Sequence, residues 1–513
     1  MPPFPHSDPG PKAALALRRE RVAVTAIVVA AVLLRGAVFL CWEQASFDSD
    51  QAVTGLMAKH LSEGRAFPLF FYGQNYMLAV QAWLAAPVFR LLGPTVFALK
   101  LPLVLLNVAT ALLLLRVLED GVGLRPACAA AAAAFFAVAP PGTAAQLVSA
   151  LGVSVEPFLY VLLIWLLRNR PVWQGLVLGV GFLHREFTAY GFVALIAVTV
   201  LDRSIFTRSR LARLAFALAV AAAVWAAVWV IRPYSSGAGP GTTPADVAGA
   251  ANNVRGLLDR VCGEPRLIGG GFRSLLGSFL GLIVGMTPAD LSGFLVNTRQ
   301  RQGQPWAWPV FAAVCAAGIA RLIWLAGRRG FLVSIRETGA AVYLFLVGAL
   351  AAAAYTAGRC GDLQVETIRY MLLSLLAPVG LAAAWLRLEP RTGVRRGVLL
   401  AVAIWSAASV AGHVRLIDEY VRHTPPAYRR ELADYLVANR IRLVRTDYWT
   451  GYQVAFLSRE RVVADTDGVW RVLQYHRWAE ERPKATYYVG RGPCANHGVE
   501  AVPGVYWVCD PPE

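Results

Sequence analysis

Apolar residues run along most of the chain in blocks as long as a membrane-spanning helix. A helix needs about 20 residues to cross the roughly 30 Å hydrocarbon core of a bilayer. Outer-membrane barrel strands instead alternate apolar and polar residues over about 10 positions. The pattern therefore predicts a mainly α-helical polytopic membrane protein with about eleven transmembrane helices. These spans are expected at 22–42, 95–116, 126–140, 146–167, 171–183, 187–201, 211–231, 306–326, 338–357, 368–386 and 397–413.

The last part of the chain follows a different pattern, in which short helical and strand-like segments alternate. Helices are expected at 427–438, 449–457 and 469–480, and strands at 441–445, 461–464 and 486–489. Alternation of this kind predicts a small α/β domain with a largely parallel sheet. The chain then divides into an amino-terminal segment (1–21), a membrane domain (22–413) and a carboxy-terminal α/β domain (414–513).

The charges indicate how the spans are oriented. The chain is 57% hydrophobic and 16% charged, with a formal net charge of +17. Arginine clusters recur after every second apolar block, which is typical of cytoplasmic loops. The first apolar block is too long for a signal peptide and is expected to remain as a span. We therefore expect a multi-pass protein of a bacterial-type plasma (inner) membrane, with a cytoplasmic amino terminus and an extracytoplasmic α/β domain.

Topology accounts for most of the positive charge, so we expect membrane lipids around the spans and no nucleic-acid partner. Two outer loops follow from this topology, at 43–94 and 232–305. The first contains an apolar segment at 75–92, which is expected to lie as a helix on the outer face. The second is rich in Gly and Pro, a composition typical of backbone that covers a site.

The seven cysteines contain no CxxC pair and no Cys/His spacing typical of a zinc or redox site. Cys494 and Cys509 lie in the part of the chain that is expected outside the cytoplasm, where disulfides form. A bridge between these two residues is one expectation, and two free thiols is the other.

The most informative polar stretch follows the first apolar block. Asp48 and Asp50 stand two residues apart where topology alone requires no acidic group. Either residue is suited to cap the helix that follows, by accepting backbone N–H bonds. The alternative is that one of them is a catalytic carboxylate. The aromatic run at 70–76 has the same two interpretations, an interfacial belt or a substrate platform.

A resemblance to a known family bears on this choice. The block from Asp48 to about Arg116 resembles the amino-terminal region of the type C glycosyltransferases, which include protein O-mannosyltransferases and lipid A aminoarabinose transferases. In that family the acidic motif of the first outer loop supplies the catalytic carboxylate, which here would be Asp50, with Asp48 as the other candidate. The matching motifs are Asp48-Ser49-Asp50-Gln51-Ala52, Gly55-Leu56-Met57-Ala58, Tyr72-Gly73-Gln74-Asn75-Tyr76, Leu92-Gly93-Pro94, Leu101-Pro102 and Arg369-Tyr370, with the tail segment 448–461.

The chain also departs from that family. Many relatives have Asp-Glu where this chain has Asp50-Gln51, and a Glu where Gln81 stands. The resemblance therefore implies Asp50 as the catalytic group but does not imply a metal. No cofactor is identified, and a divalent cation does not follow from the sequence.

Elementary chemistry leads to a similar expectation. Nucleotide sugars are absent outside the cytoplasm, so a sugar arrives there on a carrier such as polyprenyl phosphate. Transfer then needs one carboxylate to take the acceptor's proton and cations to stabilise the departing phosphate. Arginine binds two phosphate oxygens at once. Arg369, Arg359 and Arg185, at the outer ends of spans, are the candidates for binding the donor phosphate.

Further polar residues near the outer ends of spans are candidates for substrate binding. They are Tyr72, Gln74, Tyr76, Gln81, His184, Glu186 and Tyr370. The group His184-Arg185-Glu186 has a structural alternative, in which Arg185 and Glu186 pair with each other inside a short turn. Glu156 is expected to be structural and to pair with a buried arginine such as Arg35.

These observations predict an integral membrane glycosyltransferase. The expected reaction moves a sugar from a polyprenyl-phosphate donor to a lipid, glycan or protein on the outer face, with inversion and with Asp50 as the base. The α/β domain is a candidate for selecting the acceptor. The alternatives are a transporter or lipid flippase, which paired repeats and interrupted helices would favour, and a non-enzymatic envelope-assembly protein, which would be indifferent to Asp50→Asn.

Overall fold

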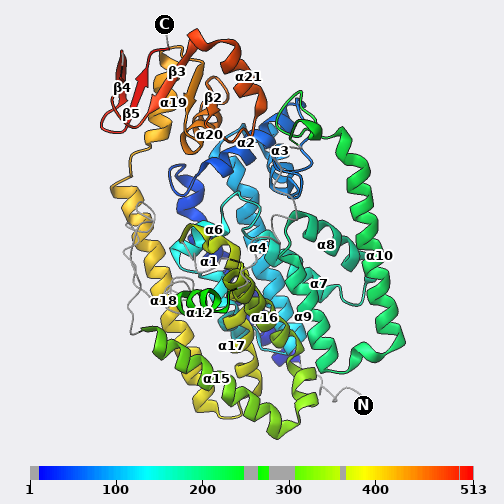
Figure 1. Cartoon of the computed structure of the whole chain (residues 1–513). Helices are drawn as coiled ribbons and strands as arrows, with labels where there is room; N and C mark the ends of the chain where they lie inside the picture. The colour runs from blue at the N-terminus through cyan, green and yellow to red at the C-terminus, as the bar shows by residue number, and fades with distance from the viewer. Residues whose placement is uncertain (1–10, 248–263, 276–306, 359–364, 496, 512–513) are drawn as a thin grey trace.

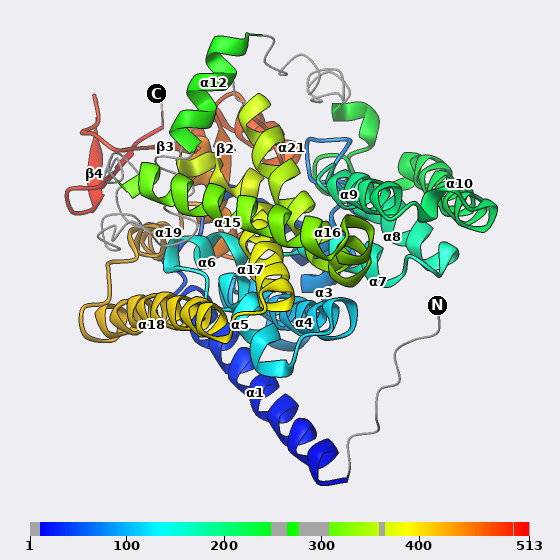
Figure 2. The same ribbon diagram turned by 90° about the horizontal axis from the view of Figure 1, so that it is seen from below.

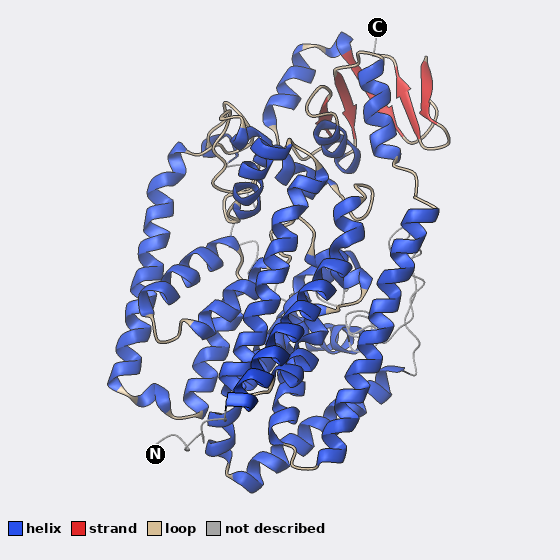
Figure 3. Ribbon diagram, turned by 180° about the vertical axis from the view of Figure 1, so that it is seen from behind, coloured by secondary structure: helices blue, strands red, loops and turns tan. Residues whose placement is uncertain are grey.

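The computed structural model is a bundle of helices that carries a small sheet domain at one end (Figure 1). It describes residues 11–247, 264–275, 307–358, 365–495 and 497–511. Arg359 and much of the predicted outer loop 232–305 lie outside the described residues. The five described strands gather at the end of the bundle opposite the start of α1 (Pro11–Cys41) (Figure 3).

Six described helices are long and apolar enough to cross a membrane, which confirms a multi-span protein. The six segments are Ala14–Cys41 in α1, Val96–Val122 (α4), Arg208–Tyr234 (α10, Arg208–Ile231, continued by η2, Arg232–Tyr234), Phe331–Ala357 (α16), Arg369–Leu388 (from η5, Val365–Leu375, into α17, Leu376–Leu388) and Thr392–Arg422 (α18). A seventh is counted when α5 (Pro126–Ala137) and α6 (Pro141–Leu147) are taken as one span bent by 82°.

Three of the predicted spans are helices of fewer than 18 residues, and the first of them is shorter than the sequence suggested. The segments expected at 146–167, 171–183 and 187–201 correspond to α7 (Glu156–Leu166), α8 (Pro171–His184) and α9 (Thr188–Leu201). The backbone at 148–155 is irregular and Pro157 stands in the first turn of α7, so the helix begins late. The remaining helices outside the sheet domain are α2 (Ser49–Ser62), α3 (Val80–Leu92), η1 (Ser204–Phe206), η3 (Pro244–Val247), α12 (Pro265–Ser274) and α15 (Ala307–Arg329).

Burial separates the flanks of the bundle from its centre. The helices α10 and α18 lie on opposite flanks in two perpendicular views (Figures 1 and 2). Only 11% of the apolar window of α10 and 22% of that of α18 are buried, whereas 72% of the window at Arg369–Leu388 is buried. Apolar helices exposed on a flank are suited to face lipid. The segment that begins at Arg369 is instead enclosed by other helices.

A buried arginine ties the centre of the bundle together in a way that the sequence did not predict. Arg35 of α1 donates to the side chain of Asn107 (2.6 Å) and to the carbonyl oxygen of Phe136 (2.5 Å). The expected pairing of Arg35 with Glu156 is therefore wrong. Glu156 is the first residue of α7 and accepts a hydrogen bond from Gln81 of α3.

The carboxy-terminal domain contains a mixed five-stranded sheet in the order β2-β1-β3-β5-β4. The strand β1 pairs in parallel with β2 and β3, while β5 pairs antiparallel with β3 and β4. The expectation of a largely parallel sheet missed the hairpin of β4 and β5. The elements are α19 (Tyr428–Ala438), β1 (Leu443–Thr446), α20 (Tyr448–Leu457), β2 (Val463–Thr466), α21 (Leu473–Glu481), η6 (Pro483–Ala485), β3 (Thr486–Gly490), β4 (Gly498–Val502) and β5 (Tyr506–Cys509).

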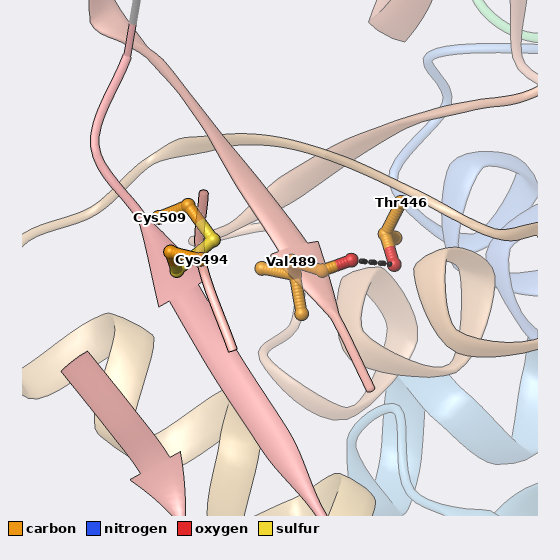
Figure 4. Close-up of a disulfide and its surroundings, with 4 residues drawn as sticks. All are labelled: Thr446, Val489, Cys494 and Cys509. Atoms are coloured by element: carbon orange, nitrogen blue, oxygen red, sulfur yellow. Dashed lines mark hydrogen bonds between the residues drawn. A yellow bond between two sulfur atoms is a disulfide. The ribbon is translucent and has the colours of Figure 1, made fainter. Parts of the chain in front are cut away.

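A disulfide closes this hairpin region. Cys494, ahead of β4, is bonded to Cys509 at the end of β5, so the bridged alternative is the one found (Figure 4). The hydroxyl of Thr446 on β1 donates to the carbonyl oxygen of Val489 on β3 (2.8 Å). The bridge fixes the antiparallel edge, and the Thr446 bond adds to the parallel pairing of the central strands.

Candidate functional site

The acidic motif lies at the start of α2, and its two carboxylates have different surroundings. Asp48 is the residue that caps α2, because its side chain accepts the backbone N–H of Gln51 (2.9 Å). The side chain of Gln51 donates to the carbonyl oxygen of Ser46 (2.9 Å) and accepts from the N–H of Ala150 (3.2 Å). The position at which many relatives carry Glu is thus occupied by an amide that links two loops.

Asp50 lies two residues into the helix and has two partners from distant parts of the chain. The hydroxyl of Tyr448 donates to Oδ1 of Asp50 (2.6 Å). Nη2 of Arg369 lies 3.7 Å from Oδ2, and the side chains of Asp50 and Arg369 are each 22% exposed. A partly exposed carboxylate can accept a proton, and a partly exposed guanidinium beside it can bind an anion.

Arg369 lies at the start of its span, and its guanidinium has a hydrogen-bond donor that the described residues do not use. Its Nε has no hydrogen-bond partner among the described residues. Its guanidinium lies over the ring of Tyr370, with Cζ 5.3 Å from the ring centroid. Of the two predicted phosphate-binding arginines that the structure describes, Arg369 pairs with Asp50, whereas Arg185 bonds the carbonyl oxygens of Gly152 and Leu151.

Arg471 is a second cation at this site, and it comes from the carboxy-terminal domain. Its Nε donates to the hydroxyl oxygen of Tyr448 (3.4 Å), and its Nη1 donates to the carbonyl oxygen of Tyr72 (3.3 Å). The guanidinium also lies over the ring of Phe71 at 5.2 Å. A hydrogen-bonded chain therefore runs from Arg471 through Tyr448 to Asp50.

The sequence analysis did not single out Tyr448 or Arg471 as site residues. Tyr448 follows β1, and Arg471 lies between β2 and α21. Because β1 and β2 are parallel, their carboxyl ends lie at one edge of the sheet, the edge at which α/β proteins bind ligands. The predicted strands at 441–445 and 461–464 carried this signal, but it does not say what the edge faces.

The loop after α2 brings the predicted aromatic run to the same place. Gly73 has φ of +72°, and its N–H donates to the carbonyl oxygen of Gly237 (2.9 Å). An added Cβ at Gly73 would lie 3.3 Å from Nη1 of Arg471, so glycine suits both the conformation and the contact. Tyr72 is fully buried, and its hydroxyl bonds Nδ1 of His60 (3.1 Å) instead of facing Asp50.

The next residues of this run lie near the same group of side chains. Gln74 closes a turn through its N–H to the carbonyl oxygen of Phe71 (2.9 Å). Burial raises the pKa of Tyr76, while the nearby charge of Arg185 lowers it. Tyr370 and Glu186 also lie near Tyr76 and raise its pKa.

Gln81 belongs to a second polar group, which it forms with Glu156 and Arg185 at the loop 148–155. Its side chain donates to Glu156 and accepts the N–H of Gly152 (2.9 Å). Arg185 donates to the carbonyl oxygens of Gly152 (3.0 Å) and Leu151 (3.4 Å). Arg185 therefore supports this loop, in place of the predicted pairing with Glu186.

His184 lies beside a small cavity next to this second group. Its Nδ1 bonds the hydroxyl of Tyr160 (2.9 Å), and its buried Nε2 has no partner among the described residues. The cavity is lined by Thr54, Met57, Phe71, Met77, Leu78, Ala79, Gln81, Ala82, Leu151, Gly152 and His184. Thr54 connects the two groups, because its hydroxyl donates to the carbonyl oxygens of Asp50 (3.2 Å) and Ala150 (2.9 Å).

The surroundings of Asp48 at the start of α2 change its pKa. Loss of hydration and the neighbouring Asp50 carboxylate raise the pKa of Asp48 to about 6, although the bond from Gln51 and the charge of Arg369 oppose this. Asp48 is thus engaged as a helix cap and resists ionisation. Asp50, whose carboxylate accepts from Tyr448 and does not cap the helix, is the other candidate of the pair.

One group of side chains in the carboxy-terminal domain has the spacing of metal ligands. In the described part of the chain, the group of three or more residues spaced to hold a metal is Asp465, His476 and Glu480 in the carboxy-terminal domain. Arg445 already bonds both carboxylates of that group, at 2.9 Å from Asp465 and also to Glu480. An arginine therefore occupies the position that a cation would take.

A cluster around Glu460 holds the carboxy-terminal domain against α2. The carboxylate of Glu460 accepts hydrogen bonds from four side chains, which are Lys59 (2.5 Å), His60 (2.9 Å), Arg65 and Tyr475 (2.7 Å). We call these five residues the Glu460 cluster. Midway along α2, the ring of Phe456 lies so close to Gly55 that an added Cβ would come within 2.5 Å of it. The two contacts fix α20 on α2.

The fold can be compared with known proteins. No protein-family model and no curated protein matches the chain. The crystal structure of ArnT from Cupriavidus metallidurans bound to undecaprenyl phosphate matches 97% of this chain and 98% of that chain, with a TM-score of 0.58 and 14% sequence identity. The apo structure of the same protein matches 93% of each chain, with a TM-score of 0.52 and 13% identity. Over nearly its full length, therefore, the chain has the fold of ArnT, an aminoarabinose transferase with the type C glycosyltransferase architecture.

Proposed function

We propose that the protein is an integral membrane glycosyltransferase that moves a sugar from a polyprenyl-phosphate donor to an acceptor. The observation that carries this proposal is the pairing of Asp50 on α2 with Arg369 at the start of a span, 3.7 Å apart. The fold supports it, since ArnT shares this fold and has been crystallised with undecaprenyl phosphate. Fold alone does not specify a substrate, so the two side chains are what make the proposal specific.

The proposed reaction is a single displacement at the anomeric carbon. The acceptor oxygen attacks that carbon while Asp50 takes the acceptor's proton, so a new C–O bond forms as the bond to the phosphate oxygen breaks. The phosphate leaves with the bonding electron pair, and Arg369 stabilises its charge. Attack from the face opposite the leaving group inverts the configuration.

The surroundings of Arg369 support its role as the donor-phosphate ligand. The residue lies where a span begins, which is the depth at which a lipid-linked phosphate sits. Its side chain is 22% exposed, and its buried Nε has no hydrogen-bond partner among the described residues, so the guanidinium keeps a donor that these residues do not use. Tyr370 and Tyr76 remain candidates for the sugar or its carrier. Arg359 stays a prediction outside the described residues.

The other predicted residues fit supporting roles in this proposal. Arg185 holds the carbonyl oxygens of the loop at 148–155, and Gln81 holds the N–H of Gly152 in that loop. We place the reaction on the outer face, as the arginine distribution predicts. The disulfide between Cys494 and Cys509 supports an oxidising location for the carboxy-terminal domain.

The direct test supplies the detergent-purified protein with a panel of polyprenyl-phosphate sugars and a crude envelope extract as acceptor. Free polyprenyl phosphate is followed by mass spectrometry. We expect one donor to be consumed, and we expect Asp50→Asn to reduce its consumption by about 100-fold or more. The matched control is Asp120→Asn, an exposed aspartate paired with Arg116 at 3.4 Å on α4, which should behave as the wild type.

Three outcomes separate the alternatives. Activity that survives Asp50→Asn but not Asp48→Asn would transfer the role of base to Asp48. Donor consumption by every variant would show that neither aspartate is the base. A wild-type protein that is folded yet consumes no donor of the panel would count against the transferase and favour a transporter or an assembly protein.

A further inference from the structure

The carboxy-terminal domain reaches the proposed base directly. The hydroxyl of Tyr448 donates to Oδ1 of Asp50 at 2.6 Å, across 398 residues of sequence. We propose that Tyr448 is a positioning residue for Asp50, so that the carboxy-terminal domain is a working part of the catalytic site. This inference rests on the proposed function, because it assigns Tyr448 a role through the base.

The geometry divides the two oxygens of the carboxylate between two tasks. Oδ1 is held by Tyr448, while Oδ2 faces Arg369 at 3.7 Å. A carboxylate held by one oxygen keeps a single orientation, so its other oxygen is presented to the acceptor beside the cation that binds the phosphate. Misplacing a reacting group by about 1 Å is enough to slow a reaction on the order of 100-fold.

Tyr448 is itself held firmly. Arg471 donates to its hydroxyl oxygen (3.4 Å), which leaves the hydroxyl hydrogen free for Asp50. The rings of Trp449 and Tyr452 pack edge-on against it, each with its centroid 5.2 Å away. Asp447 caps α20 by accepting the N–H of Thr450 (3.1 Å), so the tyrosine projects from a fixed helix start.

The protonation state of Tyr448 suits this role. Burial and the Asp50 charge raise the pKa of Tyr448 well above its ordinary value, whereas the charge of Arg471 opposes the shift. The phenol therefore stays neutral and keeps its donor hydrogen throughout the working pH range.

Two features outside the site keep Tyr448 at this distance. Phe456, on the same helix, packs against Gly55 of α2. Beyond the end of α20, Glu460 is bonded to Lys59 and His60 at the other end of α2. Both ends of α20 thus contact α2. Within this interface, Tyr448 is the residue that bonds the proposed base, Asp50.

The experiment compares Tyr448→Phe with Tyr475→Phe in the full-length protein. Each variant removes one buried hydroxyl that donates to a carboxylate, but the Tyr475 hydroxyl serves Glu460 (2.7 Å) and not Asp50. With the polyprenyl-phosphate sugar that the wild type consumes, and envelope extract as acceptor, we expect Tyr448→Phe to lower kcat by about 10- to 100-fold. The KM for the donor should stay within about twofold, and Tyr475→Phe should keep the wild-type kcat.

The activity of each folded molecule separates positioning from a general loss of structure. The comparison therefore uses kcat per folded molecule, with the folded fraction of each variant measured by size-exclusion chromatography in detergent. A merely structural tyrosine would lower the amount of active protein and leave kcat per folded molecule at the wild-type value. An unchanged kcat per folded molecule therefore overturns the proposal.

The double variant completes the test. If Tyr448 acts through Asp50, Asp50→Asn with Tyr448→Phe should be no slower than Asp50→Asn alone. Additive losses, or a wild-type kcat in Tyr448→Phe, would overturn the positioning role while leaving Asp50 as the base. Full activity in Asp50→Asn would instead overturn the proposed function itself.

Discussion

Two carboxylates lie at the contact between α2 and the carboxy-terminal domain, and they are used in opposite ways. Glu460 accepts bonds from all four other members of its cluster and is 10% exposed. Among the described residues, the carboxylate of Asp50 accepts one hydrogen bond, from Tyr448; Arg369, its paired cation, lies 3.7 Å away, and 22% of the Asp50 side chain is exposed. The first carboxylate is saturated and the second keeps room for a reactant.

Full pairing also sets the ionisation of Glu460. Burial opposes this ionisation, but the hydrogen bond and charge of His60 and the hydrogen bonds from Lys59 and Tyr475 outweigh it and hold the pKa of Glu460 well below its usual range. A carboxylate with a lowered pKa stabilises the folded protein above its unfolded pKa of about 4.3. We infer that a fully paired carboxylate serves docking, whereas one with an open oxygen serves chemistry.

The largest expected effect comes from breaking the saturated carboxylate. Glu460→Gln removes the buried negative charge that Lys59 and Arg65 share, and removing one charge from a buried cluster costs about 3 kcal/mol. We expect a lower thermal unfolding temperature in detergent and faster proteolysis between the membrane domain and the carboxy-terminal domain. Asp50→Asn should leave both measurements near the wild type.

The matched control for that prediction is Glu63→Gln. Glu63 also pairs with Lys59 (2.9 Å) and Arg65 (2.6 Å), but it is 40% exposed, so its loss should cost less than about 1 kcal/mol. On acidification, the wild type should lose the Glu460 contribution as the pH falls below about 4.3, and Glu460→Gln should lose less. Equal losses for both Gln variants would remove the distinction between the two carboxylates.

A smaller effect is expected from the helix contact between them. In Gly55→Ala the new methyl group would meet the ring of Phe456, and overpacking of this kind costs about 2 kcal/mol. Because the displaced helix carries Tyr448, kcat should fall as well. The control is Gly397→Ala on α18, where nothing lies within 4 Å of the added Cβ. Lower stability with an unchanged kcat would show that the contact is independent of the site.

The smallest effect concerns the helix cap beside the base. Asp48→Asn keeps a capping side chain, so only its charge is lost. Since the pKa of Asp48 is raised from 3.8 to about 6, the wild type should lose stability as the pH rises through this window, and the variant should not. We expect Asp48→Asn to become more stable relative to the wild type as the pH rises from about 4 to 6, in thermal unfolding at a series of pH values. A constant difference between the two proteins from pH 4 to 7 would contradict the raised pKa.

Local patterns carried much of the fold. Long apolar runs identified the helices α1, α4 and α10, and alternating short segments identified α19, β1 and α20. The hairpin of β4 and β5 was missed, since 498–509 contains little regular alternation. The irregular backbone at 148–155 shortened a predicted span, because apolar composition does not distinguish a buried loop from a helix.

Only the site residues that belong to local sequence motifs could be predicted. Asp50 and Arg369 were identified from their motifs and their positions at the ends of spans. Tyr448 and Arg471 were not identified. Their place in the site depends on which sheet edge packs against α2, and contacts across about 400 residues determine this packing. Hydrophobic periodicity reports only local structure and does not predict such contacts. The pairing of Glu156 with Arg35 failed for the same reason.

The sequence separation of 398 residues between Asp50 and Tyr448 also delays their contact during synthesis of the chain. At roughly 5 to 20 residues per second, a ribosome completes the aspartate some 20 to 80 s before the tyrosine. During that interval the first spans are already in the membrane, while the Asp50 carboxylate still lacks its Tyr448 partner. Under the proposed mechanism, a chain released before Tyr448 is made should therefore transfer sugar at least about 10-fold more slowly than the finished chain.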